Sequence, residues 1–594
     1  MVLNSNKMMR KYKFAIIFAI AAISVLIVSY LISNFDSPPA SKLETPLPQI
    51  SKSKNPVTPT VKSEPSIGTN LSSISYWSSQ HPFLDAFKSS GAWITQNEKV
   101  WDTKESDRLD LDENGWVKSL PRTGSGSQYT SVGTLMFRDL QGRYPGGQYV
   151  VLYQGQGTIE YGFDAKKNQA ASRFGRDVID VTPSNAGIWL KITATDPNRT
   201  GNYLRNIRVV PIADENSYQR QIFNPDFIEK VKAFKVFRFM DWMATNGSTQ
   251  RQWSDRPTPQ DARYSIKGVP VELMVELSNR TNSDPWFTMP HMASDEYVAN
   301  FARYVKDHLE PGRKVYVEYS NEVWNGKFPQ NRWALQQGKA YFSGTQGSDY
   351  TKAMRWYGKR TTEITKIWDR VFGKDKDRVI GVMAGQAANP QVVKDALSYP
   401  RSDRPLSHQK YGIDAIAIAP YFGGYLGSPK HQDQVVIWTL EADGGLDLLF
   451  EEIAKGGVLS DGPSGGALQQ AYNWIETHAE LARQENLQLL AYEGGQHLAG
   501  VNGVENNDAI TELFIQANRN PRMGKIYKEY LKKWFELGGG LFVNFSDIGQ
   551  PSKWGSWGIL EYVEQDSAPK YDAFLDLLDR FSSSKQQKSQ RSNS

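Results

Sequence analysis

Residues 315–322, VYVEYSNE, form an apolar, β-prone run that ends in Asn321 and Glu322. A second such run, residues 489–495 (LLAYEGG), ends in Glu493. Continuous apolar runs of this length are typical of parallel strands that are buried on both faces. A turn residue is expected where a strand ends, so a glutamate at the end of both runs requires a separate explanation.

Similar runs recur after residue 212 and alternate with longer helical stretches. The first helix is predicted by Asn224 as a cap and Pro225 as the first helical residue. The strand-like runs are IRVVP (207–211), VFRFM (236–240), VELMV (271–275), VYVEY (315–319), VIGVMA (379–384), AIAIAPY (415–421), LLAYE (489–493) and LFVNF (541–545). Eight parallel strands joined by helices predict an α/β fold, a (β/α)8 barrel over residues 216–581. Glu322 and Glu493 then end strands four and seven, on the face where barrel active sites lie.

Residues 76–215 show a different pattern, in which short alternating apolar runs are broken by Gly, Asp and Asn. This spacing predicts an all-β sandwich before the barrel. Asp110-Leu-Asp-Glu-Asn-Gly115 resembles the start of a calcium loop, but Pro121 stands where the bidentate Glu belongs. We therefore favour a tight polar turn. The sandwich is compatible with carbohydrate binding and equally with a structural role.

The two ends of the chain are expected to lie outside the folded domains. Residues 1–13 are basic, and residues 14–32 (FAIIFAIAAISVLIVSYLI) carry no charge and nearly match a bilayer core. They predict a transmembrane signal anchor with the N-terminus inside and the bulk of the chain outside the cytoplasm; a cleaved signal peptide and a secreted protein is the alternative. Residues 33–75 predict a disordered Pro/Ser/Lys linker, and residues 582–594 a disordered tail.

Composition excludes several classes of function. The formal net charge is +5, but cations at the two ends account for it, so the region between them is close to neutral and predicts no nucleic-acid surface. The chain has no cysteine, which excludes disulfides, thiolate zinc sites and thiol nucleophiles. No motif calls for a cofactor. The chain has 17 Trp and 28 Tyr, which fits large aromatic cores and a sugar-stacking site equally well.

Two glutamates at the ends of barrel strands suggest glycosidic bond chemistry. Hydrolysis of that bond uses one carboxyl group that is held protonated as an acid and one that is ionised as a nucleophile or base. The same pair would also serve a transglycosylase. Glu493 and His497 together could instead be metal ligands, but a Gly-Gly loop fixes no common face for them, so we expect no metal.

The motifs resemble those of clan A retaining glycoside hydrolases, of the exported bacterial cellulase-like or "cellulose-binding" type. The resemblance covers roughly residues 216–580. It implies Glu322 as acid/base and Glu493 as nucleophile. The positions that match the substrate-binding residues of this group are Asn321, Arg238, His291, Tyr421 and Trp554 or Trp557, and Trp324 is a further candidate for stacking on sugar.

These roles have physical consequences. In a retaining enzyme the two carboxyls lie about 5–5.5 Å apart. The charge of Glu493 is expected to raise the pKa of Glu322 and keep it protonated. Arg238 and Tyr421 are expected to hold Glu493 ionised, and Asn321 to contact the sugar 2-hydroxyl. Glu318 shares a strand face with Glu322 and is expected to point into the barrel.

The sequence therefore predicts an enzyme that cleaves a β-linked polysaccharide with retention of configuration. Two alternatives remain open: a polysaccharide-binding protein of the same fold without turnover, and a transglycosylase. The expected partners are a polysaccharide or oligosaccharide and, through residues 14–32, a membrane.

Overall fold

The computed structural model describes residues 65–122, 126–398 and 408–592, with side chains up to residue 581. The apolar segment 14–32 and most of the 33–75 linker lie outside the described residues. Within the described part of the chain, no helix is both long enough and apolar enough to cross a bilayer.

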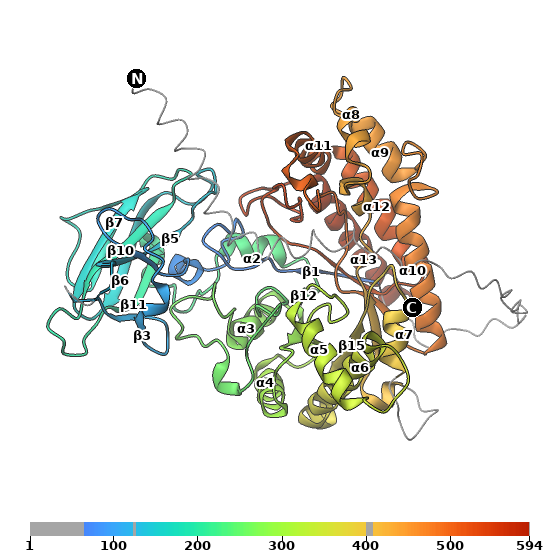
Figure 1. Cartoon of the computed structure of the whole chain (residues 1–594), viewed down its shortest axis with the longest axis horizontal. Helices are drawn as coiled ribbons and strands as arrows, with labels where there is room; N and C mark the ends of the chain where they lie inside the picture. The colour runs from blue at the N-terminus through green and yellow to red at the C-terminus, as the bar shows by residue number, and fades with distance from the viewer. Residues whose placement is uncertain (1–64, 123–125, 399–407, 593–594) are drawn as a thin grey trace, which may run out of the picture.

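The larger part of the structure is a closed barrel of eight parallel strands, each paired with its neighbours in chain order. It closes where the first strand pairs with the last, with Ser66 opposite Leu541 and Thr69 opposite Asn544. The predicted (β/α)8 barrel is therefore confirmed (Figure 1). Its strands are β1 (Ser66–Asn70), β12 (Val236–Arg238), β13 (Asp284–Met289), β14 (Val315–Tyr319), β15 (Val379–Ala384), β16 (Ala415–Ile418), β17 (Gln488–Ala491) and β18 (Leu541–Asn544).

Two of the eight strands differ from the prediction. The first barrel strand is β1, which lies in the stretch that we expected to be disordered linker, whereas the IRVVP run forms β11 (Arg205–Pro211) outside the barrel. The VELMV run opens helix α3 (Val271–Thr281), and the third strand is β13. In α3 the buried residues recur at helical spacing, which a five-residue window does not distinguish from a strand.

Helices cover the outside of the barrel between successive strands (Figure 1). The first of them, α2, begins as predicted, with Pro225 in its first turn and the Asn224 side chain accepting a hydrogen bond from the Asp226 backbone N–H. The helices are α2 (Pro225–Val231), α3, α4 (Asp295–His308), α5 (Pro329–Tyr341), α6 (Asp349–Phe372), α7 (Gln391–Leu397), α8 (Gln432–Trp438), α9 (Leu446–Ala454), α10 (Gly466–Gln484), α11 (Asp508–Arg519), α12 (Pro521–Glu536) and α13 (Pro569–Ser592).

Helix α13 corrects the prediction for the C-terminus. It continues to Ser592 through most of the stretch 582–594 that we expected to be a disordered tail. Its earlier part packs against the barrel through Tyr571, Ala573 and Phe574, all of which are buried.

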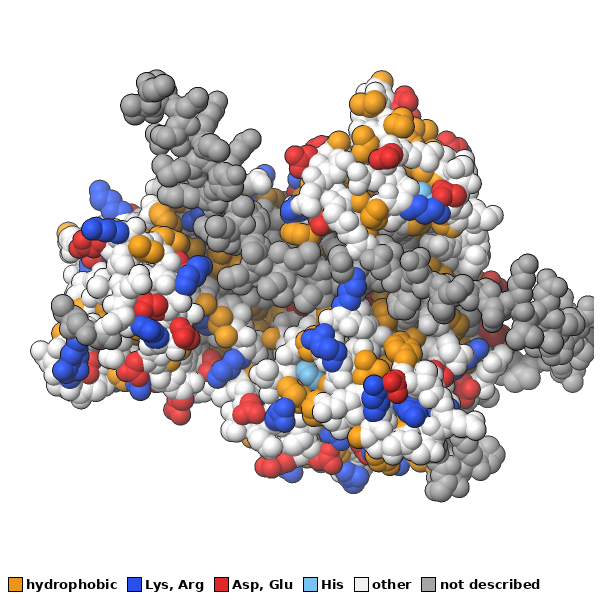
Figure 2. Space-filling model, in the orientation of Figure 1, with side chains coloured by type: hydrophobic (Ala, Val, Ile, Leu, Met, Phe, Trp, Pro, Cys, Tyr) orange, Lys and Arg blue, Asp and Glu red, His pale blue; other side chains and the backbone are white. Residues whose placement is uncertain are grey.

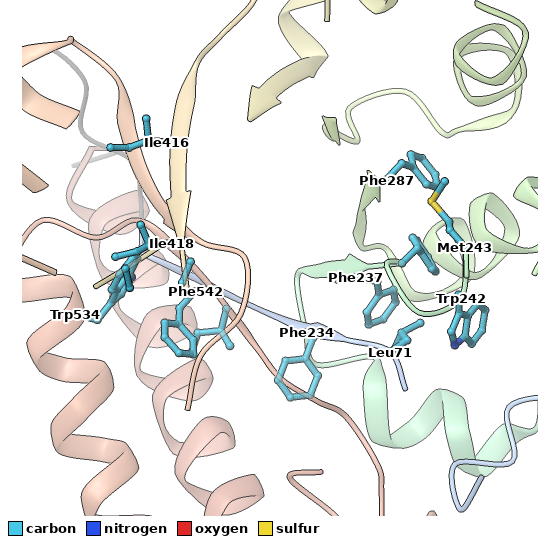
Figure 3. Close-up of a cluster of buried hydrophobic side chains, with 14 of the residues drawn as sticks. Leu71, Phe234, Phe237, Trp242, Met243, Phe287, Ile416, Ile418, Trp534 and Phe542 are labelled. Atoms are coloured by element: carbon cyan, nitrogen blue, oxygen red, sulfur yellow. The ribbon is translucent and has the colours of Figure 1, made fainter. Parts of the chain in front are cut away.

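Alternation along the barrel strands divides the buried side chains between two layers. One cluster fills the barrel itself and includes Trp286, Val382 and Tyr492. A much larger cluster lies between the strands and the surrounding helices. Figure 3 shows part of it, with Phe237, Phe287 and Phe542 pointing from their strands toward the helices. Residues that point the other way, among them Arg238 and Glu318, face the barrel interior.

A second unit of two antiparallel sheets is inserted between β1 and β12 and lies beside the barrel (Figure 1). We call it the two-sheet unit. One sheet has the order β2-β5-β10-β7 and the other β11-β6-β9-β8, and side chains from both contribute to one buried cluster. The strands are β2 (Ile94–Gln96), β5 (Ser131–Met136), β6 (Gly147–Gln154), β7 (Gly157–Phe163), β8 (Ala165–Lys167), β9 (Arg176–Val181), β10 (Ile188–Thr195) and β11, with a small hairpin of β3 (Asp110–Leu111) and β4 (Val117–Ser119).

Specific contacts hold the two-sheet unit against the barrel loops. Lys88 Nζ donates to the carbonyl oxygen of Asp261 at 2.6 Å, and the Ala262 N–H donates to the Asn114 carbonyl at 2.8 Å. Ala262, from a loop of the barrel, is part of the buried cluster of the two-sheet unit. The loop between β12 and α3 is thus seated on this unit.

Candidate active site

A fully buried arginine at the end of β12 organises the C-terminal face of the barrel. The Arg238 guanidinium donates to Glu318, Glu493, Asn70 and Asn321 over distances of 2.8–3.1 Å. It also lies over the ring of Tyr492, with 5.0 Å from Cζ to the ring centroid. Burial alone would lower the pKa of Arg238, but the charges of Glu318 and Glu493 raise it above its ordinary value. Arg238 is therefore a permanent cation shared between two buried carboxyls.

Glu318 points into the barrel, as predicted from its position on the strand face. Arg238 Nε and Nη2 bond its two carboxyl oxygens at 3.0 and 3.1 Å, a two-pronged contact that fixes the guanidinium plane. Trp286 Nε1 donates to the same carboxyl at 2.8 Å. Glu318 is 1% exposed and lies below the strand ends, so it positions Arg238 and has no access to a substrate.

Glu493 lies just beyond the end of β17 and is held by two donors. Arg238 Nη1 lies 2.9 Å from one of its carboxyl oxygens, and the Tyr421 hydroxyl donates to the other at 3.0 Å. Burial raises the pKa of Glu493, while Arg238 and the Tyr421 hydrogen bond oppose this shift. Both predicted partners of Glu493 are thus in place.

Glu322 lies beyond the end of β14 and has neutral partners only. The Tyr492 hydroxyl donates to one carboxyl oxygen at 3.1 Å, and Asn325 Nδ2 donates to the other at 2.8 Å. Its backbone has φ of +41°, and Ser320 has +57°, a region that L-residues rarely occupy and that is common where side chains are held for function. This turn directs Glu322 toward Tyr492, the neighbour of Glu493.

The two carboxyls influence each other electrostatically. Burial raises the pKa of Glu322 to about 8, and the charge of Glu493 adds to the shift. The predicted direction is correct, but burial rather than Glu493 is the larger cause. Because Glu493 has a guanidinium in contact and Glu322 has none, Glu493 is the carboxyl that ionises first and Glu322 the one that keeps its proton.

The raised pKa of Glu322 predicts an effect on stability. Its pKa in the folded state, about 8, lies above the usual value of 4.5, so its contribution to stability is complete at low pH and is lost as pH rises from about 4.5 to 8. A neutral glutamine avoids this loss. We expect Glu322→Gln to unfold at a higher temperature than the parent at pH 8 and to show no such gain at pH 4. Thermal unfolding at both pH values measures this, with Glu476→Gln on the exposed face of α10 as control. An equal effect of Glu322→Gln at both pH values would contradict the assignment.

Asn321 is brought to the same network. Its Oδ1 accepts from Arg238 at 2.8 Å, and its Nδ2 donates to Asn246 Oδ1 at 3.1 Å. Gln330 Nε2 bonds both Asn246 Oδ1 and the Asn321 carbonyl, each at 2.8 Å. An amide nitrogen carries two hydrogens, so Asn321 retains a second N–H for a ligand hydroxyl.

Trp557 is the better placed of the two tryptophans after β18. Its ring meets Tyr421 edge-on at 5.9 Å between centroids and His497 at 5.0 Å, and its Nε1 donates to the Trp554 carbonyl at 2.9 Å. Trp557 therefore adjoins the residue that holds Glu493. Trp554 lies on the same loop, with Lys553 over its ring.

For two further predicted site residues the structure shows contacts with groups other than Glu322 and Glu493. Trp324 belongs to the large buried cluster and is 9% exposed, and its stacking on a sugar stays a prediction. His291 packs against the Trp333 ring at 6.2 Å, and its carbonyl accepts from Tyr319. Burial lowers the pKa of His291 to about 4, with a further contribution from Arg251, so it is neutral at physiological pH.

Three members of the network had not been predicted: Asn70, Tyr492 and Asn325. Asn70 ends β1, and its Nδ2 donates to the carbonyls of Tyr492 and Asn544, which ties the first strand to the last two. Tyr492 precedes Glu493, so strict alternation would have placed the two on opposite faces. Both face the site because β17 ends at Ala491 and the chain turns there. Asn325 lies three residues after Glu322, in a turn.

No metal centre is indicated by the described residues, which contain no group of three or more His, Asp or Glu side chains arranged to hold an ion. The network's own charges are one guanidinium and the carboxyls around it. A carboxyl that is held ionised beside one that keeps its proton can supply a nucleophile or base together with an acid.

No protein-family model matches the chain, and no curated protein matches it in sequence. Solved structures of clan A glycoside hydrolases, the group that the sequence resembles, do match. A Bacteroidetes-affiliated GH5 cellulase is 8% identical, with a TM-score of 0.34, over 60% of this chain and 84% of that one. A xyloglucan-specific endo-β-1,4-glucanase from a metagenomic library is 14% identical, with a TM-score of 0.33, over 61% of this chain and 90% of that one. The Thermotoga petrophila endo-β-1,4-mannanase is 13% identical, with a TM-score of 0.26, over 60% of this chain and 72% of that one.

Proposed function

We propose that this protein is a glycoside hydrolase that cleaves a β-linked polysaccharide with retention of configuration. The observation that carries the proposal is the unequal environment of two carboxyls at the ends of β14 and β17. Glu493 accepts from a guanidinium and a tyrosine hydroxyl, whereas Glu322 accepts from neutral groups only and has a pKa raised to about 8. An acid and a nucleophile at neutral pH need this asymmetry.

In the first step Glu493 would attack the anomeric carbon while Glu322 gives its proton to the leaving oxygen. The C–O bond to the leaving sugar breaks, and a glycosyl ester on Glu493 forms. Glu322, now ionised, would then take a proton from water as that water attacks the anomeric carbon, which breaks the bond to Glu493 and restores both carboxyls. Arg238 and Tyr421 would stabilise Glu493 when it leaves as a carboxylate.

The second N–H of Asn321 suits a hydrogen bond to the sugar 2-hydroxyl, a contact that strengthens as positive charge develops on the ring. Trp557, beside Tyr421, offers an aromatic edge and face for the sugar bound next to Glu493. These two assignments follow from position in the network and from the family resemblance.

The test is release of reducing ends from β-glucans, xylans, mannans and arabinans by the full chain. The chain must include β1 (Ser66–Asn70), because this strand closes the barrel. We expect hydrolysis of at least one polymer, with a rate that falls as pH rises past about 8, where Glu322 loses its proton. Glu476→Gln should match the parent, and Glu322→Gln should lose about 10²–10⁴-fold in rate. Binding of a polymer with no release of reducing ends, unchanged by Glu322→Gln, would favour a non-catalytic binding protein instead.

A further inference from the structure

Three aromatic side chains meet on the two-sheet unit, away from the barrel network. Trp101 and Phe163 have ring centroids 5.6 Å apart, Trp101 and Trp189 5.4 Å, and Phe163 and Trp189 5.7 Å. Their planes differ by 29–41°. Each ring thus touches both others, and we call this group the aromatic triad.

The aromatic triad is not part of the hydrophobic core. On β10 the side chains of Ile188, Leu190 and Ile192 enter the buried cluster, so Trp189, which alternates with them, faces the outer side of the sheet. Trp101 is 38% exposed and Phe163 is 49% exposed. Large aromatic rings that remain exposed together are uncommon on a protein surface and mark a binding site more often than scattered apolar residues do.

The backbone beneath the rings is adapted to hold them. A Cβ at Gly133 would lie 2.6 Å from Trp189 Nε1, and a Cβ at Gly162 would lie 2.6 Å from Trp189 Cε3. Glycines on β5 and β7 therefore let the indole lie flat across both neighbouring strands. Phe163 has φ of +60°, a conformation that is rare for a bulky residue. The chain adopts a strained conformation there and presents a ring to solvent, a combination found mainly at functional positions.

Charged side chains border the rings, and each of them is paired with a side chain of opposite charge. Arg138 lies over the Phe163 ring at 5.7 Å and pairs with Asp139 at 3.7 Å. Lys191 lies over the Trp189 ring at 5.5 Å and pairs with Glu160 at 3.4 Å. Basic and acidic side chains are likewise interspersed on the face of this unit that Figure 2 shows. The surface thus combines flat apolar rings with hydrogen-bonding edges of balanced charge.

We propose that the aromatic triad binds a neutral polysaccharide, with the C–H faces of successive sugar rings on Trp101 and Phe163 and hydroxyls bonded by the flanking ion pairs. A sugar ring has this same pattern of apolar faces and polar edges, and an uncharged chain suits a border without net charge. A second copy of this protein suits it less, because a face-to-face contact would bury both ion pairs twice at a desolvation cost. The choice of a polysaccharide as occupant rests on the proposed function of the barrel.

One hydrogen bond joins the loop beside the aromatic triad to the loop after β18. Asp139, the neighbour of Arg138, accepts a hydrogen bond on its carbonyl from Gln550 Nε2 at 3.2 Å. Gln550 lies on the loop after β18 that carries Trp554 and Trp557. One extended sugar chain that leaves the triad along this loop would therefore reach the face of the barrel where Glu322 and Glu493 lie.

The test compares polymer binding by full-length variants that all carry Glu493→Gln, so that turnover does not remove the ligand. Pull-down with microcrystalline cellulose, insoluble xylan and insoluble mannan measures binding. We expect the parent to bind at least one of these polymers. The double variant Trp101→Ala/Phe163→Asn should bind the same polymer at least about ten-fold more weakly. Asparagine tolerates positive φ, so this variant should keep the fold, which thermal unfolding checks. Phe174→Ala removes an aromatic that is 78% exposed on the same unit but outside the triad, and should bind like the parent.

Each outcome has a defined meaning. This proposal is overturned if the polymers retain the triad variant as well as they retain the parent. It is also overturned if none of the three polymers retains the parent. A triad variant that changes the oligomeric state of the protein and not its retention would assign the surface to self-association. Hydrolysis is measured separately without Glu493→Gln. If the parent is retained through the triad but releases no reducing ends, the proposed function fails while the binding surface stands. If the protein hydrolyses a polymer and the triad variant is retained as well as the parent, the binding surface fails while the proposed function stands.

Discussion

Replacement of Glu493 by glutamine is expected to lower kcat on the preferred polysaccharide on the order of 10⁴-fold or more. The amide keeps an acceptor for Arg238 or Tyr421 and nearly the same volume, but it cannot attack the anomeric carbon. Kinetics of purified parent and variant measure the loss. Glu476→Gln, an exposed carboxylate on α10, is the control and should retain full activity.

Azide distinguishes the roles of the two glutamates. In Glu493→Gly, azide should occupy the place of the missing nucleophile and restore turnover of an activated β-glycoside, with a glycosyl azide of inverted configuration as product. In Glu322→Ala, azide should intercept the ester on Glu493 and give a product of retained configuration. The two assignments would have to be exchanged if the two variants gave the opposite products, and a Glu493→Gln variant as active as the parent would eliminate the mechanism.

Replacement of Arg238 by methionine is expected to cost about 3–5 kcal/mol in free energy of unfolding, because two buried carboxyls lose their cation. Lysine should recover only part of this loss, since an ammonium does not reproduce the two-pronged contact with Glu318. Denaturant unfolding measures the change. Arg303→Met, on the exposed side of α4, is the matched control and should stay within about 0.5 kcal/mol.

The deficit of Arg238→Met should depend on pH. Without the cation, the pKa values of Glu318 and Glu493 in the folded state rise further above their unfolded values. Their contribution to stability is then present at low pH and lost as pH increases, so the gap between parent and variant should be small near pH 4 and large near pH 8. A gap that is independent of pH, or no larger than that of Arg303→Met, would contradict the role of Arg238. Glu318→Gln in the Arg238→Met background should restore part of the stability.

Much of the barrel was predictable because buried parallel strands leave continuous apolar runs. Strand β1 was not, since SIGTN follows a Pro- and Ser-rich stretch and has one large apolar residue, Ile67. Packing in the barrel requires a glycine in this strand, because a Cβ at Gly68 would lie 2.6 Å from the Val236 carbonyl oxygen. Strand β13 was missed because it begins with Asp284 and Pro285, residues that are uncommon in strands.

The site was predicted where residues follow a strand motif, as with Arg238, Glu322 and Glu493. It was missed where position depends on contacts distant in sequence. Asn70 reaches Arg238 only because β1 closes the barrel, and Tyr492 faces Glu322 only because β17 ends early.

The pairing of β1 with β18 has a consequence for how the protein is made. The first strand leaves the ribosome before the two-sheet unit and must wait for the last strand, so its partner is among the final elements to be synthesised. Contacts of such long sequence separation slow folding, and until β18 arrives the unfinished sheet has an edge available to other chains. The two-sheet unit, whose pairings are local, can fold during that interval and hold β1 and β12 close together at its two ends. A nascent chain stalled before residue 541 should therefore contain a folded two-sheet unit and an open, aggregation-prone sheet.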